Sequence, residues 1–242
     1  MRILVVNPNT TASMTALIGD CARAAVGPGV AVDAVNPDAG PESLESHYDE
    51  AVAVPHLLAE LTRGERQGYD GFVVACFGDP GLDAAREVVD GPVVGIAEAA
   101  MRTAAYLARR ISVVTTLSRV VGHTWDIARS YGLGDLVVGI HACEIPVVAL
   151  ETDPAAYATI LAACRTALER DRSEAIVLGC AGMADLCAKL AVELGVPVVD
   201  GVAAATAEVE KLVRLGLTTS KSGEYAAPPA KRFGVALDQA LG

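Results

Sequence analysis

Hydrophobic positions along the chain alternate between two kinds of segment. Short apolar runs rich in Val and Ile are typical of strands that are buried on both faces of a parallel sheet. Between them lie longer stretches rich in Ala and Leu, with apolar residues at helical spacing. The predicted strands cover residues 2–7, 30–35, 71–75, 93–95, 111–115, 136–140, 175–179 and 196–199. The predicted helices cover residues 11–26, 48–67, 82–89, 96–109, 119–131, 154–170, 183–194 and 202–215.

The alternation of strand and helix predicts an α/β fold with parallel sheets and right-handed crossovers. Proline suits the first turn of a helix, so we expect one helix to begin at Pro154. Residues 218–231 carry Thr, Ser, Gly and Pro and are expected to run over the surface. Residues 232–241 are predicted to form a short final helix.

An internal repeat divides the chain into two similar halves. Residues 70–78 align with residues 174–182 at an offset of 104. Each segment has an acidic residue, an apolar run, a cysteine, and a glycine two positions later. A second pair, residues 92–95 and 197–200, follows at an offset of 105. Any two strand–helix–strand units share Val and Ala, but this recurrence in register favours a true repeat.

The repeat predicts two pseudo-symmetric domains, each a small parallel sheet flanked by helices, with an active site in the cleft between them. Residues 1–97 and 206–242 are assigned to the first domain, which carries Cys76. Residues 98–205 form the second, which carries Cys180.

Composition narrows the class of protein. Hydrophobic residues make up 52% of the 242 positions and charged residues 20%, enough apolar material for a sizeable core. The net charge of −11 disfavours nucleic acid and anionic membranes as partners. No apolar run approaches the ~18 residues of a membrane span, and the start of the chain is too polar for a signal peptide. We therefore expect a soluble, cytoplasmic protein.

The chain has six cysteines, which should be free thiols in a reducing cytoplasm. They have no zinc-ligand spacing, and the four histidines are not expected to cluster. Three cysteines lie in helical patterns and are interpreted as packing residues, and a fourth, Cys143, lies in a polar loop without a counterpart. Cys76 and Cys180 differ because both follow a strand, where ligands of parallel sheets bind.

Each of these cysteines begins a strand-to-helix turn with outward-pointing amides. Such a turn favours negative charge, and can lower a thiol pKa towards neutrality or hold an oxyanion. Two thiols facing each other across a cleft suit the inversion of a carbon centre. One thiolate removes a proton from one face, and the opposite thiol delivers a proton to the other. No cofactor is needed where carbonyl groups already acidify the C–H bond.

Four segments together resemble the hydantoin racemases of the aspartate/glutamate racemase superfamily. They are residues 3–11, which contain Asn-Pro-Asn-Thr, residues 40–45, and the two cysteine turns at 75–82 and 178–183. The resemblance extends to about residue 215. It implies a two-domain α/β fold, two catalytic cysteines, no cofactor, no metal, a small hydantoin-type substrate and a homo-oligomer.

The resemblance also implies particular site residues. Cys76 and Cys180 match the catalytic positions, and Asn9 and Thr10 match a substrate-contacting loop. Thr116 is expected to face the same cleft from the second half. The remaining implied contacts are backbone amides that hold the ring carbonyls, those of Phe77, Gly78, Asp79, Ala181, Gly182 and Met183.

Several alternatives stay open at this stage. The amino-acid racemases usually carry Asn-Thr and Thr-His after their cysteines, whereas this chain has Phe77-Gly78 and Ala181-Gly182, which suit a neutral ring better. Other candidates are an allantoin racemase, a maleate-type isomerase, a thiol redox protein and a small-molecule binding protein with packing cysteines. Among other residues, His123 is a candidate for the pocket edge, Glu45 for the cleft and Asp79 for a helix cap.

Overall fold

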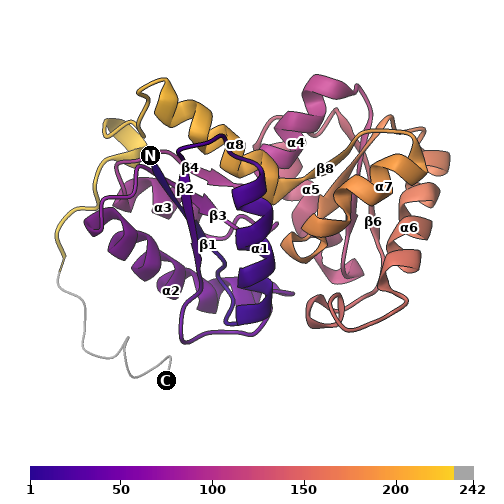
Figure 1. Cartoon of the computed structure of the whole chain (residues 1–242), viewed down its shortest axis with the longest axis horizontal. Helices are drawn as coiled ribbons and strands as arrows, with labels where there is room; N and C mark the ends of the chain where they lie inside the picture. The colour runs from indigo at the N-terminus through magenta and orange to yellow at the C-terminus, as the bar shows by residue number, and fades with distance from the viewer. Residues whose placement is uncertain (232–242) are drawn as a thin grey trace.

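The computed structural model describes residues 1–231, so the predicted helix at 232–241 lies outside it. Two four-stranded parallel sheets form the framework (Figure 1). The first has the order β2-β1-β3-β4 and the second the order β6-β5-β7-β8. The two orders are equivalent position by position, which agrees with the repeat. The strands are β1 (Arg2–Val6), β2 (Ala31–Val35), β3 (Gly71–Val74), β4 (Val93–Gly95), β5 (Ile111–Thr115), β6 (Val137–Ala142), β7 (Ala175–Gly179) and β8 (Val198–Asp200).

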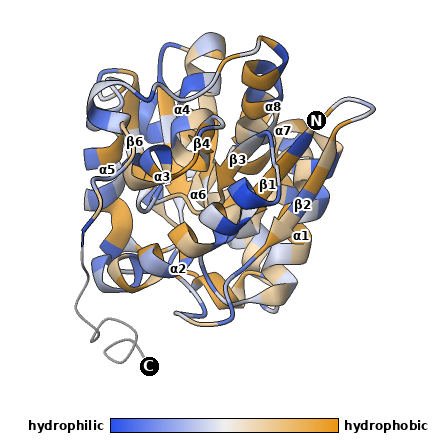
Figure 2. Ribbon diagram, turned by 90° about the vertical axis from the view of Figure 1, so that its left-hand side faces the viewer, coloured by the Kyte–Doolittle hydropathy of each residue, from blue (hydrophilic) through white to orange (hydrophobic). Residues whose placement is uncertain are grey.

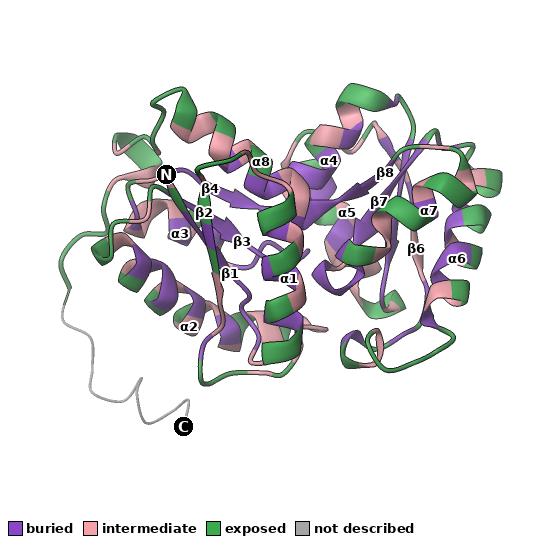
Figure 3. Cartoon of the chain, in the orientation of Figure 1, coloured by how far each residue is buried: buried purple, intermediate pink, exposed green. Residues whose placement is uncertain are grey.

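Helices cover both sheets, and their outer faces are exposed while their inner faces are buried (Figure 3). The α-helices are α1 (Ala12–Ala24), α2 (His47–Arg66), α3 (Leu82–Val88), α4 (Ile96–Leu107), α5 (Val121–Ser130), α6 (Ala156–Asp171), α7 (Cys187–Leu194) and α8 (Gly201–Arg214). Short 3-10 helices occur at Ser118–Val120, Val147–Ala149, Ala181–Leu186 and Gly223–Tyr225. Among the described residues, no helix is both long enough and apolar enough to cross a membrane.

Three predicted helix starts are too early. Helix α5 begins at Val121 rather than at residue 119, after the 3-10 helix Ser118–Val120. Helix α6 begins at Ala156 rather than Pro154, because the Asp153 side chain accepts a hydrogen bond from the Ala155 amide at 2.8 Å and holds Pro154 in a turn. After Cys180 the chain forms the 3-10 helix Ala181–Leu186 before α7 starts. A tight 3-10 turn keeps the first amides close to the strand end.

The strands supply the core because both of their faces are covered. Every residue of β3, β5 and β7 is buried, and hydrophobic colouring runs along the inner strands (Figure 2). Helix α8 returns to the first sheet, where Val209 lies so close to Gly71 that a side chain at Gly71 would collide with it. This return supports a first domain made from both ends of the chain, although the boundaries at 97/98 and 205/206 stay predictions.

Candidate active site

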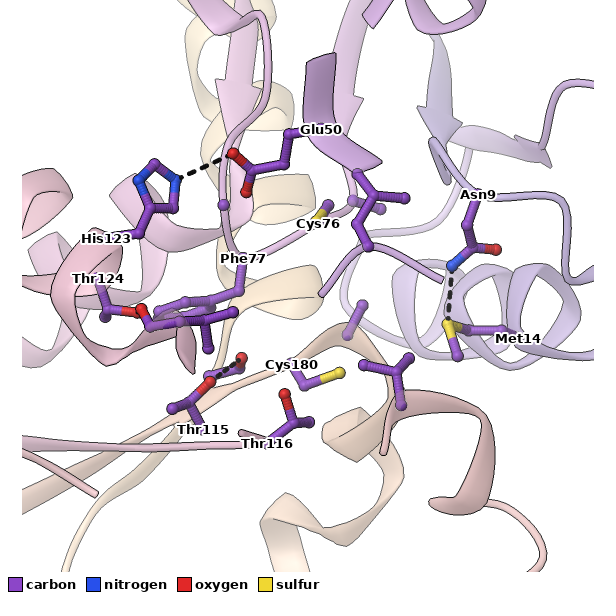
Figure 4. A pocket seen from close by; sticks show the side chains of 17 residues that line it. Asn9, Met14, Glu50, Cys76, Phe77, Thr115, Thr116, His123, Thr124 and Cys180 are labelled. Carbon is purple, nitrogen blue, oxygen red and sulfur yellow. Dashed lines mark hydrogen bonds and ion pairs between the residues drawn. The ribbon is translucent and has the colours of Figure 1, made fainter. Parts of the chain in front are cut away.

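The carboxyl ends of β1, β3, β5 and β7 converge on one cavity of about 60 Å³ between the two sheets (Figure 4). Cys76 and Cys180 lie on opposite sides of this cavity, which we call the cysteine cavity. Its wall is formed by Asn9, Met14, Leu44, Glu50, Ala75, Cys76, Phe77, Gly78, Thr115, Thr116, Val120, His123, Thr124, Val147, Gly179, Cys180 and Ala181.

The two cysteine turns have the same hydrogen bonds. The Asp79 amide donates to the Cys76 carbonyl at 2.9 Å, and the Met183 amide donates to the Cys180 carbonyl at 3.1 Å. The Gly78 amide donates to the Cys76 sulfur, and the Gly182 amide donates to the Cys180 sulfur. Each glycine amide therefore favours the thiolate form of its neighbour.

Burial outweighs these amides in both turns. It raises the pKa of the Cys180 thiol to about 12 and that of the Cys76 thiol further still. The negative charge of Glu50 adds to the rise at Cys76. The lowered thiol pKa expected from the turn is thus absent, because protein surrounds both sulfurs except where they border the cavity. Both cysteines are protonated for most of the time at neutral pH.

The Asn9 side chain offers a hydrogen-bond donor to the cavity. Its oxygen accepts from the Asn7 side chain at 2.8 Å and from the Thr11 amide at 2.9 Å. Its Nδ2 then points to the wall, where the Met14 sulfur lies 3.3 Å away (Figure 4). Since both acceptor positions of the oxygen are occupied, Asn9 presents N–H rather than C=O to a ligand.

Thr10 is not part of the cavity wall. Its amide donates to the Pro41 carbonyl at 3.0 Å, and its hydroxyl faces the same carbonyl at 3.4 Å. Thr11 similarly donates through its hydroxyl to the Glu42 carbonyl at 2.7 Å. The first loop therefore uses these threonines to hold residues 40–42, and the substrate contact expected of Thr10 stays a prediction.

Asp79, Gly182 and Met183 also lie outside the wall. The amides of Asp79 and Met183 close their own turns, and the contacts with ring carbonyls expected of them stay predictions. The Gly182 amide faces the Cys180 sulfur instead. Phe77, Gly78, Ala181 and Thr116 do line the cavity.

The Asp79 side chain caps a helix, but a different one from the helix that follows it. Its carboxylate accepts from the Ala97 and Glu98 amides of α4 at 3.1 and 2.9 Å, and from the Tyr131 hydroxyl at 2.6 Å. Gly95 allows this approach, since any side chain there would collide with the carboxylate. Asp79 is thus a positioning residue for the Cys76 turn.

Glu50 and His123 add charge to the wall, opposite Phe77 and beside Cys76 (Figure 4). Glu50 comes from α2 and His123 from α5, with 3.3 Å between Oε2 and Nε2. Hydrogen bonding to Glu50 raises the pKa of His123. The sequence indicated only His123 as a candidate; no periodicity distinguishes Glu50 from the other acids of its helix.

Glu45 lies outside the wall, but its side chain forms a hydrogen bond with the other half of the molecule. Its Oε1 accepts from the Val147 amide at 2.7 Å, which ties the loop after β2 to the 3-10 helix Val147–Ala149 of the other half. The histidines cluster more than expected, since the rings of His47 and His123 are 5.1 Å apart.

The arrangement places two thiols, amide donors and a donor side chain around one small space. Proton donors and acceptors on opposite sides of a ligand suit acid–base chemistry at a carbon centre. Two equivalent α/β halves thus enclose one cavity whose wall includes two thiols. Residues 3–209 match the family model described as Asp/Glu/Hydantoin racemase, and the chain belongs to this family. It is an isomerase of the racemase type.

Known proteins are similar in sequence to this chain over nearly its full length. The hydantoin racemase of Pseudomonas sp. (strain NS671) is 46% identical over 98% of this chain and 96% of its own. The hydantoin racemase of Rhizobium meliloti is 47% identical over 96% of each chain. The solved structure of allantoin racemase from Klebsiella pneumoniae is 48% identical, with a TM-score of 0.96, over 100% of this chain and 98% of that one.

Proposed function

We propose that the protein racemises 5-substituted hydantoins through Cys76 and Cys180. The observation that carries this proposal is the pair of thiols at equivalent strand ends on opposite sides of one cavity. The names of the relatives support the substrate class. The protein is proposed to act in the cytoplasm as a homo-oligomer.

The reaction needs one thiolate and one thiol. The thiolate takes the proton from the 5-carbon, and its electron pair moves into the adjacent ring carbonyl to form a planar enolate. The opposite thiol then delivers its proton to the other face, which restores the C–H bond with inverted configuration. The two sulfurs have then exchanged protonation states, so the enzyme is ready for the opposite enantiomer. A further turnover in the same direction needs the original protonation states to be restored.

Ring carbonyls accept hydrogen bonds in this scheme from Asn9 Nδ2 and from the Phe77 and Ala181 amides. Donors aimed at the oxygen stabilise the enolate more than the neutral ring, because charge develops there during proton removal. No metal or organic cofactor enters the scheme, since the carbonyl group itself accepts the electron pair.

Allantoin is the second candidate substrate. Its 5-substituent is a ureido group with several N–H donors, and the Glu50 carboxylate in the wall is an acceptor for them. The allantoin racemase of Klebsiella pneumoniae supports the same choice.

The test uses single enantiomers of 5-benzylhydantoin and of allantoin in deuterated buffer. Optical rotation and the NMR signal of the 5-proton should both decay faster than in protein-free buffer. The faster of the two substrates identifies the preferred 5-substituent. Binding of either compound without loss of rotation would instead indicate a binding protein and overturn the proposal.

A further inference from the structure

Two histidines and one glutamate meet beside the cysteine cavity although they are distant in sequence. His47 and Glu50 lie three residues apart on the first turn of α2, so both face one side of that helix. His123 comes from α5 in the other half. One ligand atom from each of the three residues lies within 4.8 Å of the other two.

Among the described residues, His123 Nε2 has one weak partner in this cluster. It is buried, and Glu50 Oε2 lies 3.3 Å away in a long and poorly aligned contact. A buried polar atom that is so weakly satisfied can still accept a ligand. The nitrogen borders a hollow of about 130 Å³, which is also lined by Ser46, His47, Glu50, Arg119 and Val120.

The donor set is that of a divalent transition metal. Two imidazoles and one carboxylate are a common three-ligand zinc set, which leaves a fourth position open. Ligand atoms about 2.0–2.2 Å from such an ion lie roughly 3–4 Å from one another. The three ligand atoms lie within 4.8 Å of one another, so the exposed His47 side chain has to rotate to reach this spacing.

The surrounding charges are mixed but favour a cation. Arg119 lines the same hollow and repels a metal ion, yet it is exposed and its charge is screened by salt. Asp126 lies near His123 on the other side, and the whole chain carries a net charge of −11.

We propose that His47, Glu50 and His123 bind Zn²⁺ or a similar divalent transition metal, and that this metal slows racemisation. Glu50 and His123 also form part of the cysteine cavity wall, and Glu50 packs against the Gly78 turn. A metal held by Glu50 and His123 therefore fixes two side chains in the wall of a cavity of only about 60 Å³. The spacing of residues along the chain gave no sign of the site, because its third ligand comes from another helix.

The binding test first removes the two thiols of the cysteine cavity, which compete for the metal. The Cys76→Ser/Cys180→Ser double variant, treated with EDTA and dialysed, is titrated with Zn²⁺ against a chromophoric chelator. We expect one Zn²⁺ per chain, and we expect His47→Ala in this background to weaken binding about tenfold or more. Binding does not depend on turnover, so this test stands apart from the proposed function.

A matched control is His56→Ala, which removes the other histidine of α2; His56 is half-buried and lies outside the cluster. It should bind Zn²⁺ as tightly as its parent. Co²⁺ provides a second readout, because its visible spectrum distinguishes nitrogen and oxygen ligands from thiolates. Equal affinity in the His47→Ala and His123→Gln variants and their parent would overturn the site.

The inhibition test uses the protein with both cysteines. Zn²⁺ should slow racemisation reversibly, and EDTA should restore the rate. His47 does not line the cysteine cavity, so His47→Ala should keep the basal rate and need about tenfold more Zn²⁺ for the same inhibition. If His47→Ala is inhibited at the same Zn²⁺ concentration, the thiols themselves are the target and the regulatory part of the proposal is wrong.

Discussion

The Cys76 and Cys180 turns occupy equivalent places in the two sheets, yet they are supported in different ways. At the third position after the cysteine, the first turn has Asp79 and the second has Met183. Asp79 is bound to α4 by hydrogen bonds, whereas Met183 is fully buried in the apolar core of the second half. The symmetry therefore covers the reacting groups but not the side chains behind them.

The N-terminal caps of α4 and α8 also differ between the two halves. Asp200 caps α8 from its own N-cap position, through the Val202 and Ala203 amides at 3.0 and 2.8 Å. The equivalent position before α4 is Gly95, and the carboxylate comes from Asp79 instead. Because the capping carboxylate of α4 belongs to the cysteine turn and not to the helix, it connects the Cys76 turn to α4. Within residues 1–231, the Met183 side chain of the second turn makes no such hydrogen bond, so the two thiols should respond differently to the same kind of mutation.

The largest effect should come from the thiols themselves. Cys76→Ser and Cys180→Ser should each lower the racemisation rate by about 10³-fold or more, because each removes one of two required proton-transfer groups. Each single variant should still exchange the 5-proton of one enantiomer for deuterium, with opposite enantiomers in the two variants. NMR in deuterated buffer measures this exchange. Normal racemisation by both variants would rule out the mechanism.

The next effect should come from Asp79→Asn. Asparagine keeps the volume and tolerates the positive φ of 45° at this position, but its NH₂ group faces amide donors. We expect a loss of about 2 kcal/mol in unfolding free energy and of about tenfold or more in kcat.

Asp200→Asn is the control for Asp79→Asn, since it should lose stability without losing activity. Urea unfolding and initial racemisation rates measure the two effects. Equal kcat values for Asp79→Asn and the wild type would show that the Cys76 turn does not need its anchor.

The Asp79 anchor should also depend on pH. Burial raises the pKa of Asp79 from 3.8 to about 7. A folded-state pKa above the unfolded value means that the contribution of Asp79 to stability is complete below about pH 4 and is lost as the pH rises through 7. The stability difference between wild type and Asp79→Asn should therefore shrink over this window. Urea unfolding at several pH values measures it, and a difference that grows with pH would contradict the assigned direction.

A smaller difference should separate the two glycines beside the sulfurs. A Cβ at Gly78 would overlap the Glu50 carboxylate, whereas a Cβ at Gly182 would lie 3.1 Å from Leu150 and 3.7 Å from the Cys180 sulfur. Gly78→Ala should therefore slow racemisation by about tenfold, and Gly182→Ala by less. Steady-state kinetics of both variants measure the two losses of racemisation rate. A larger loss in Gly182→Ala than in Gly78→Ala would contradict the prediction.

The smallest effect concerns the reactivity of the two thiols. Glu50 and Asp79 both oppose a negative charge on Cys76, whereas Glu45 is the one carboxylate that opposes it on Cys180. Cys180 should therefore be alkylated by iodoacetamide a few-fold faster than Cys76, and both rates should still increase above about pH 9 because both pKa values are raised. Peptide mass spectrometry separates the two sites. Faster labelling of Cys76 would reverse the assignment.

The strands and the repeat could be predicted from sequence because buried parallel strands leave continuous apolar runs. The places of Cys76 and Cys180 at strand ends followed from the same pattern. Glu50 could not be found this way, since its position in the cavity depends on how α2 packs against α5. The sequence also gave no sign that the amides of Thr10 and Asp79 donate hydrogen bonds inside a loop and a turn, because such hydrogen bonds leave no periodic trace.

The return of α8 to the first sheet has a consequence for synthesis of the chain. Val209 of α8 packs directly over Gly71 at the start of β3, and Val202 and Val209 belong to the same buried core as β1. During translation, helix α1 covers only part of one face of the first sheet, and the rest of that face stays exposed until residues 201–214 leave the ribosome. The second half, although made later, already has all four of its strands at that moment. The half whose synthesis begins first is thus the half whose core is completed last. Its sheet keeps some apolar surface exposed until α8 has been made.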